Sequence, residues 1–342
     1  MTGSDGGMAW PMDRGTTLKL LVGFAVALVL VYLLGAVIGW DRTIERLRTA
    51  DLYWVGVACV STLLCLLAWT KTWQVVLGAA GVNVPFRKLV VTFYAATFAN
   101  YITPMGQAGG EPFIAYILSR DTEANYEQSL ASVVTADLLR MLPFFNVGLV
   151  GLGYLLLQSQ LPEGTEQFAA LLLGLAITLP VGIVLAWRYR DAVQRAVVRL
   201  FAPLATRTDR FTVEGVRKRI DRLYESIDLI AESPWDLLVA VAFAYVGWVL
   251  FALPLYFSGL ALGLEISLLL VAFLVPVTVI AGSTPLPGGL AAIEGSLVVL
   301  LTALLAFTAD EALAVTTVYR LTSYWFVVGV GGIATFWVLA RV

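Results

Sequence analysis

The stretch "TPMGQAGGE", Thr103 to Glu111, places a proline, three glycines and a carboxylate inside a long apolar region. Proline and glycine interrupt helices, and a carboxylate is costly in hydrocarbon. A second stretch, "STPLPGGLAAIEG" from Ser283 to Gly295, repeats the order Thr-Pro, Gly-Gly, Glu with a different spacing. The two motifs, 103–111 and 284–294, therefore predict two broken helices, and their paired residues are Gly109 with Gly288, Gly110 with Gly289, and Glu111 with Glu294.

Composition indicates an integral membrane protein. Of the 342 residues, 59% are hydrophobic and only 13% are charged, which is far from the balance of a soluble domain. The first apolar run is too long for a signal peptide and lacks a cleavage site, so we expect it to stay as a membrane helix. The sequence predicts an all-α polytopic fold of about eight membrane helices. The clearest runs are Leu18–Trp40, Leu52–Ala80, Leu142–Leu157, Phe168–Trp187, Leu237–Phe257 and Leu313–Leu339.

The charge pattern predicts the domain organisation. Residues 188–233 hold ten of the 22 Lys and Arg residues, and basic loops are cytoplasmic. The apolar residues of this segment recur at three- and four-residue steps, which favours an interfacial amphipathic helix. A docking site for a cytoplasmic partner or for inner-leaflet lipid is the alternative. The expected parts are an N-terminal tail (1–17), a first membrane half (18–187), a cytoplasmic segment (188–234) and a second membrane half (235–342).

The remaining connections follow from this cytoplasmic segment. The acidic connections around Glu163, Glu265 and Asp310 should be external, and both termini cytoplasmic, in a plasma-membrane protein. Residues 41–51 form an awkward exception, because this connection comes out external although it carries three arginines.

Two interrupted segments have both ends on one side of the membrane. Residues 89–118 begin and end inside, and their parts are too short for two crossings, so we expect a re-entrant hairpin. Residues 268–307 begin and end outside, and either two crossings or re-entry would satisfy them. Because non-helical backbone within a membrane must be buried in protein or line an aqueous cavity, both interruptions predict a cavity.

The resemblance between the halves extends beyond the motifs. Arg140 follows Glu111 by 29 residues, and Arg320 follows Glu294 by 26. Aromatic residues and then glycines come after each arginine. The two units enter from opposite faces, so the pattern predicts an inverted repeat, an arrangement with which transporters build midplane binding sites. Ordinary turns outside the membrane are the simpler interpretation of Thr-Pro and Gly-Gly pairs.

The segments "ANYITPMGQAGGEPFIAYILSR", "STPLPGGLAAIEGSLVVLL" and "YRLTSYWF" resemble the membrane region of lysylphosphatidylglycerol synthases and related flippase-like proteins. The resemblance runs from about residue 15 to the end of the chain. It implies a flippase-type fold and movement of charged or phosphorylated lipids between leaflets. No aminoacyl-transferase domain follows in this sequence, so the resemblance does not imply synthase activity.

Five ionisable residues stand inside apolar helices: Glu111, Asp137, Arg140, Glu294 and Arg320. Asp137 and Arg140 are three apart and can pair on one helix face, whereas Arg320 needs a distant partner, with Glu294 or Glu111 the first candidates. In a flippase the arginines would hold a lipid phosphate. The glutamates would bind the arginines, a cationic headgroup or a proton. The glycines Gly109, Gly110, Gly288 and Gly289 would let backbone N–H groups approach the phosphate.

Catalytic patterns are missing from the sequence. The chain has no histidine and only two cysteines, Cys59 and Cys65, for which apolar packing is the expected role. We find no DxD metal pair, no nucleophile beside a base and no P-loop. The sequence therefore predicts a lipid flippase and not an enzyme, with no cofactor, no metal and no nucleic-acid partner. A membrane-embedded enzyme or a scaffold of lipid or polyprenyl-phosphate glycan metabolism is the alternative.

Overall fold

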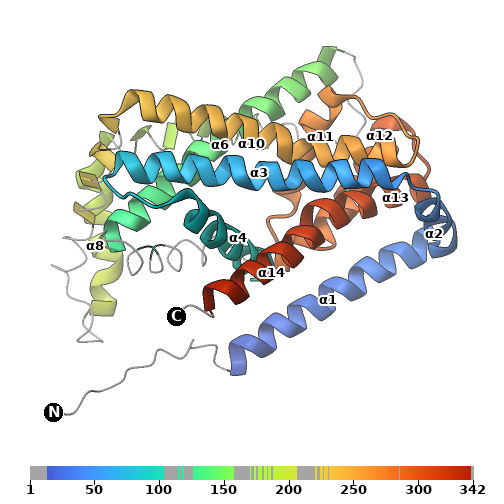
Figure 1. Ribbon diagram of the computed structural model, residues 1–342, viewed down its shortest axis with the longest axis horizontal. Coiled ribbons are helices and arrows are strands. Elements are labelled where there is room, and N and C mark those ends of the chain that lie inside the picture. Colours follow the sequence, from blue (N-terminus) through green and yellow to red (C-terminus); the bar gives the residue numbers. More distant parts are fainter. Residues whose placement is uncertain are drawn as a thin grey trace.

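The computed structural model describes residues 14–103, 126–157, 188–205, 231–284 and 286–339, with Ala115, Leu118 and parts of 170–185 and 220–229. All regular secondary structure in these parts is helical (Figure 1), as the sequence predicted. The α-helices are α1 (Arg14–Ile38), α2 (Trp40–Arg48), α3 (Leu52–Ala79), α4 (Phe86–Ile102), α6 (Tyr126–Leu157), α8 (Arg190–Ala205), α10 (Pro234–Ala261), α11 (Leu268–Ala281), α12 (Ala292–Leu305), α13 (Ala309–Arg320) and α14 (Phe326–Leu339). A 3₁₀ turn, η1 (Pro287–Gly289), precedes α12, and a π-helix, η2 (Leu321–Trp325), joins α13 to α14.

Five helical segments of the described chain are long and apolar enough to cross a membrane. They are Leu52–Ala79, Tyr126–Leu157, Pro234–Ala261, Pro287–Leu305 and Ala309–Val338, and shorter apolar helices occur at Leu28–Ile38 and Leu268–Ala281. Large apolar side chains on these helices point outward, for example Val150, Val249 and Phe336, as expected for surfaces in contact with lipid. The chain is an integral membrane protein.

Several helix boundaries differ from the predicted ones for local reasons. Helix α1 begins four residues earlier than Leu18, inside the predicted tail, and stops at Ile38 because Gly39 adopts φ 113°, a conformation that favours glycine. The expected connection at residues 41–51 is largely the short helix α2. Helix α13 begins at Ala309 and not Leu313, since Thr308 and Glu311 form a reciprocal capping box.

Two antiparallel helices, α3 and α10, pack against each other along their length (Figure 1). The Asp51 N–H donates to the Ala261 carbonyl at 2.8 Å, which joins the start of α3 to the end of α10. Along their length, the Ser61 hydroxyl donates to the Leu250 carbonyl at 2.8 Å. Hydroxyl to carbonyl bonds of this kind hold membrane helices together where lipid gives no hydrophobic drive.

The local geometry of α3 and α10 repeats with a constant shift. Both helices have 28 residues, and adding 182 to Leu52 gives Pro234. Each ends in a glycine of positive φ, Gly81 at 80° and Gly263 at 68°, in the capping turn that glycine favours. The following helices, α4 and α11, begin at Phe86 and Leu268, again 182 apart. The two segments thus share the length of the first helix, the glycine turn and the start of the next helix.

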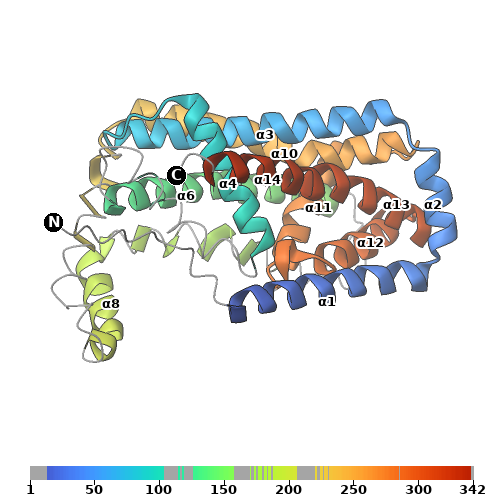
Figure 2. The same cartoon turned by 60° about the horizontal axis from the view of Figure 1, so that its bottom comes forward.

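The outer helices pack in a crossed manner. Helix α4 packs against α14 of the other half, and α11 packs against α6 (Figure 2). At each of these two contacts, a glycine leaves room for the neighbouring helix. A Cβ on Gly151 of α6 would lie 2.4 Å from the Phe273 backbone nitrogen, and one on Gly331 of α14 would lie 2.7 Å from the Tyr94 carbonyl oxygen. Small residues allow such close approach between membrane helices.

The awkward arginine-bearing connection has a structural explanation. Arg46 of α2 pairs with Asp310 at 2.6 Å and with Glu311 at 3.1 Å. The hydrogen bond to Asp310 raises the pKa of the Arg46 guanidinium. These contacts place three segments at one end of the molecule (Figure 2): residues 41–51, the start of α13 and the end of α10. The sequence predicts that the connections at all three lie on the same side of the membrane, and their common position agrees with this.

The crossed packing predicts a matched pair of stability effects. We expect Gly151→Val and Gly331→Val each to destabilise the protein by about 1–3 kcal/mol, because the new methyl groups overlap backbone of the neighbouring helix. Thermal unfolding in detergent measures the effect. A Cβ added at Gly153 or Gly329 would have open space around it to 4 Å, so Gly153→Ala and Gly329→Ala are the controls. Equal melting temperatures for all four variants would contradict the crossed contacts.

Candidate functional site

The second motif is an interruption held between two helices. Helix α11 ends before Gly282, η1 follows, and α12 begins at Ala292. Gly288 and Gly289 have φ values of 57° and 62°, and Ala291 is at 68°, where non-glycine residues are strained. A Cβ on Gly288 would lie 2.0 Å from the Tyr324 ring. Glycine is therefore required at position 288 by both conformation and space.

Glu294 and Arg320 form a buried ion pair next to this interruption. The Arg320 Nε donates to Glu294 Oε1 at 2.6 Å, and the residues are 7% and 5% exposed. A second guanidinium nitrogen donates to the Gly288 carbonyl at 2.9 Å. The Arg320 guanidinium carbon also lies 4.3 Å from the centre of the Tyr324 ring. Of the two partners predicted for Arg320, the structure pairs it with Glu294, whereas Glu111 lies outside the described residues.

Two oxygen atoms of the motif, Glu294 Oε2 and Thr284 Oγ1, are buried without a hydrogen-bond partner among the residues that the structure describes. A buried carboxylate oxygen without a donor is unusual, since most buried polar atoms are paired. Glu294 thus uses one oxygen to hold Arg320 and keeps the other available for a proton, a water molecule or a donor group of a ligand.

The backbone just after Arg320 is a π-helix, which the sequence did not predict. Residues 321–325 form η2, and the carbonyl of Thr322 accepts a hydrogen bond from the Thr62 hydroxyl of α3 at 3.0 Å. π-Helical turns are rare and are frequent at functional sites. The signal in the sequence that points to the π-helix is Arg320, an arginine inside an apolar helix.

Tyr101 connects the first half of the chain to the second motif. Its ring stacks on Tyr324 with centroids 5.4 Å apart, and its carbonyl accepts a hydrogen bond from the Tyr324 hydroxyl at 3.3 Å. Tyr101 stands two residues before Thr103, and helix α4 contacts η1. The end of α4, which leads into the first motif, therefore reaches the second one. Gly109, Gly110 and Glu111 lie outside the described residues.

Arg140 lies in a separate cluster of aromatic residues. It pairs with Asp137 at 2.7 Å, as the three-residue spacing predicted, and Asp137 also accepts a hydrogen bond from Trp73 Nε1 at 3.1 Å. The guanidinium carbon lies 4.0 Å from the Trp69 ring centre and 5.5 Å from that of Phe93, within cation–π range. Its Nε is buried and has no acceptor in the described part of the chain, so this arginine retains an unused donor there.

The second glycine pair makes a contact with Arg320 that the sequence did not predict. The Gly288 carbonyl accepts a hydrogen bond from the guanidinium at 2.9 Å, and the Gly289 N–H donates to the Leu286 carbonyl at 3.1 Å within the turn. The approach of the Gly288 and Gly289 N–H groups to a phosphate stays a prediction. In this conformation the Gly288 carbonyl positions the arginine.

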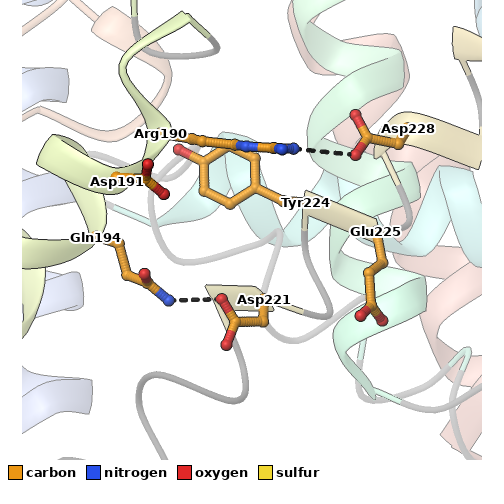
Figure 3. Close-up of a pocket in the computed structure, with 7 residues that line it drawn as sticks. All are labelled: Arg190, Asp191, Gln194, Asp221, Tyr224, Glu225 and Asp228. Carbon is orange, nitrogen blue, oxygen red and sulfur yellow. Dashed lines mark hydrogen bonds and ion pairs between the residues drawn. The ribbon is translucent and has the colours of Figure 1, made fainter.

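A hollow of about 280 Å³ lies between α8 and the described residues of 221–228, away from the Glu294–Arg320 pair (Figure 3). Arg190 pairs with Asp228 at 3.3 Å and Gln194 donates to Asp221 at 2.6 Å. Burial raises the pKa of Tyr224, and the charge of Arg190 opposes that shift. Four carboxylates line the hollow, from Asp191, Asp221, Glu225 and Asp228. This surface is acidic, which does not favour anionic headgroups at this place.

The buried Glu294–Arg320 pair predicts that single substitutions lower the stability of the protein more than a double substitution would suggest. We expect Glu294→Ala or Arg320→Ala alone to cost about 3–5 kcal/mol of stability, because each leaves an uncompensated charge in a buried place. Replacing both together, Glu294→Met with Arg320→Met, should cost much less than the sum. Thermal unfolding of the three variants in one detergent measures this. Additive losses would show that the two side chains do not depend on each other.

Comparison with known proteins gives a consistent result. The profile of the family "Lysylphosphatidylglycerol synthase TM region" matches residues 20–331. A UPF0104 membrane protein of Methanothermobacter thermautotrophicus is 26% identical over 323 residues, which cover 91% of this chain and 92% of the relative. A UPF0104 membrane protein of Pyrococcus horikoshii is 24% identical, covering 92% and 95% of the two chains. The chain belongs to the lysylphosphatidylglycerol synthase TM region family.

Proposed function

We propose that this protein is a flippase that moves a phosphate-containing lipid, such as an anionic phospholipid or a lipid-linked sugar, between membrane leaflets. The observation that carries the proposal is the buried Glu294–Arg320 pair at a break in the helices, with Glu294 Oε2 unpartnered within the described residues. Ionisable residues inside a membrane usually serve substrate or ion pathways. Family membership supports a role connected with membrane lipids.

The chemistry of the pair suits exchange with a phosphate. A guanidinium binds carboxylate and phosphate oxygens by the same parallel hydrogen bonds and keeps its charge. Without substrate, Glu294 occupies Arg320. When a lipid phosphate arrives, it takes the place of Glu294, and the released carboxyl group takes up a proton or accepts from a donor on the headgroup. Glu294 thereby keeps Arg320 from standing unpaired in the membrane.

We infer that the two halves form an inverted repeat. The constant shift of 182 residues, the antiparallel α3 and α10, and the exchange of α4 and α11 between the halves support it. Such repeats let a transporter expose one site to either side in turn. Arg140 would be the counterpart of Arg320 in the first half, with a side chain that is 22% exposed.

We further infer that residues 268–307 enter the membrane and return. Helices α11 and α12 have 14 residues each, about 21 Å at 1.5 Å per residue, whereas the hydrocarbon core is about 30 Å thick. The apolar segment Pro287–Leu305 reaches the length of a span only when the η1 turn is counted together with α12. The positive φ angles between α11 and α12 place the turn at Gly288 and Gly289. In the proposed arrangement the protein lies in the plasma membrane with both termini cytoplasmic, and it carries out no covalent chemistry.

Leaflet exchange of a labelled phospholipid in proteoliposomes tests the function. We expect Arg320→Gln and Glu294→Gln to reduce the rate of exchange of fluorescent phosphatidylglycerol about 10- to 100-fold, the effect of losing one or two charged hydrogen bonds. Dithionite quenching of the outer leaflet measures the rate.

Arg199→Gln is the matched control, because it removes one positive charge from an exposed position of α8. Size-exclusion profiles establish that each variant is assembled. Exchange at the wild-type rate in the Arg320 and Glu294 variants would refute the site. A wild-type protein that exchanges no lipid, while its 188–233 segment binds a protein partner, would favour the scaffold alternative.

A further inference from the structure

A second hollow lies where α3 ends and α4 begins. It has a volume of about 430 Å³ and is lined by Lys71, Gln74, Val82, Asn83, Val84 and Pro85. Gln74 donates to the Val84 carbonyl at 3.1 Å and so fixes the connection that forms the floor. The apolar lining residues come from the turn between two helices, at the boundary of the predicted membrane span Leu52–Ala79.

Lys71 brings a cation into this hollow, where its contacts within the described chain are with neutral groups. Its ammonium group donates to the Gln74 amide oxygen at 2.8 Å and lies 5.9 Å from the Phe86 ring centre. A half-buried lysine on a membrane helix is normally paired or faces an aqueous path. Here its full charge remains available to a ligand in the hollow.

The start of α4 adds positive charge to the same place. Arg87 and Lys88 stand in its first turn, which holds no acidic residue, and no side chain caps the helix at Pro85. Cations at a helix N-terminus repel the positive end of the helix dipole, whereas an anion there is stabilised. Helix α13 shows the ordinary arrangement, with Asp310 and Glu311 in its first turn.

The equivalent place in the other half has no such charges. With the shift of 182 residues, the positions of Lys71, Arg87 and Lys88 correspond to Leu253, Leu269 and Leu270. The backbone of the two turns matches, with Gly81 and Gly263 both at positive φ. Lys71 and Arg87 are therefore not required by the backbone of this turn, because the corresponding turn of the other half has leucines at both positions.

We propose that the hollow formed by Lys71, Gln74 and the start of α4 binds the phosphate of an anionic lipid headgroup. Lys71 contacts the phosphate, the first turn of α4 supplies the surrounding positive field, and the exposed Pro85 contacts the glycerol. The position of the hollow at the end of the apolar span Leu52–Ala79 favours a lipid over free phosphate. The site is distinct from Glu294 and Arg320 and goes beyond the proposed function, since it gives the protein a preferred side for receiving lipid.

Lipid retention tests the site. The full chain is exchanged from detergent into phosphatidylcholine nanodiscs containing a minor share of phosphatidylglycerol, and the lipid that stays bound on release is measured by native mass spectrometry. We expect Lys71→Gln and Arg87→Gln each to weaken the preference for phosphatidylglycerol about fivefold, the usual effect of one basic residue near a membrane surface. Lys71→Arg should retain the preference.

Arg48→Gln is the matched control, because it removes one exposed positive charge at the opposite end of the molecule. An unchanged lipid preference in Lys71→Gln and Arg87→Gln would overturn the proposal. Displacement of phosphatidylglycerol by an equal concentration of inorganic phosphate would also overturn it, in favour of a free-anion site. If Lys71→Gln does not assemble, the exposed Arg87 position decides. The assay does not depend on transport, so its failure and that of the proposed function can be told apart.

Discussion

The hydrogen bonds of Arg320 join a break in the helices to the rest of the fold. Inside a membrane, backbone that leaves a helix must find its hydrogen bonds within the protein. The Gly288 carbonyl meets this requirement by accepting from Arg320 at 2.9 Å, and Arg320 is neutralised by Glu294 at 2.6 Å. Tyr324, one turn further, fills the space that Gly288 leaves open and reaches Tyr101 of α4. The Arg320 guanidinium, together with Tyr324, therefore joins the turn and the π-helix to the end of α4.

The two halves keep one backbone plan and differ in where they place charge. The central helices have the same length and the same glycine cap, and the outer helices cross to the opposite half. Within this frame, Arg320 is tied to a carboxylate from another helix, whereas Arg140 is tied to Asp137 of its own helix and to aromatic rings. If the two halves form the proposed inverted repeat, this difference would let its two sides bind one ligand unequally.

Hydropathy and charge determine which features of this protein are predictable from its sequence. The all-α membrane class, most helix positions and the Asp137–Arg140 and Glu294–Arg320 pairs follow from apolar runs and from the cost of isolated charges in hydrocarbon. Helix α2 was not predicted because a short polar helix gives no hydropathy signal. The π-helix η2 was not predicted because it depends on tertiary partners such as Thr62. The contact between the Gly288 carbonyl and Arg320 was not predicted, because it depends on backbone angles that residue type alone does not specify.

The energetics of a buried ion pair make the Glu294–Arg320 pair suitable for exchange. Removing two opposite charges from water costs several kcal/mol per ion, and their attraction returns roughly that amount. The pair as a whole therefore adds little net stability, although either member alone would be strongly unfavourable. A phosphate that replaces the Glu294 carboxylate at Arg320 meets the same donors and the same surroundings, so the free-energy difference between the two states is small. The proposed flippase requires such a balance to take up and release its lipid, because an arginine without a competing carboxylate would retain an anion in the membrane interior.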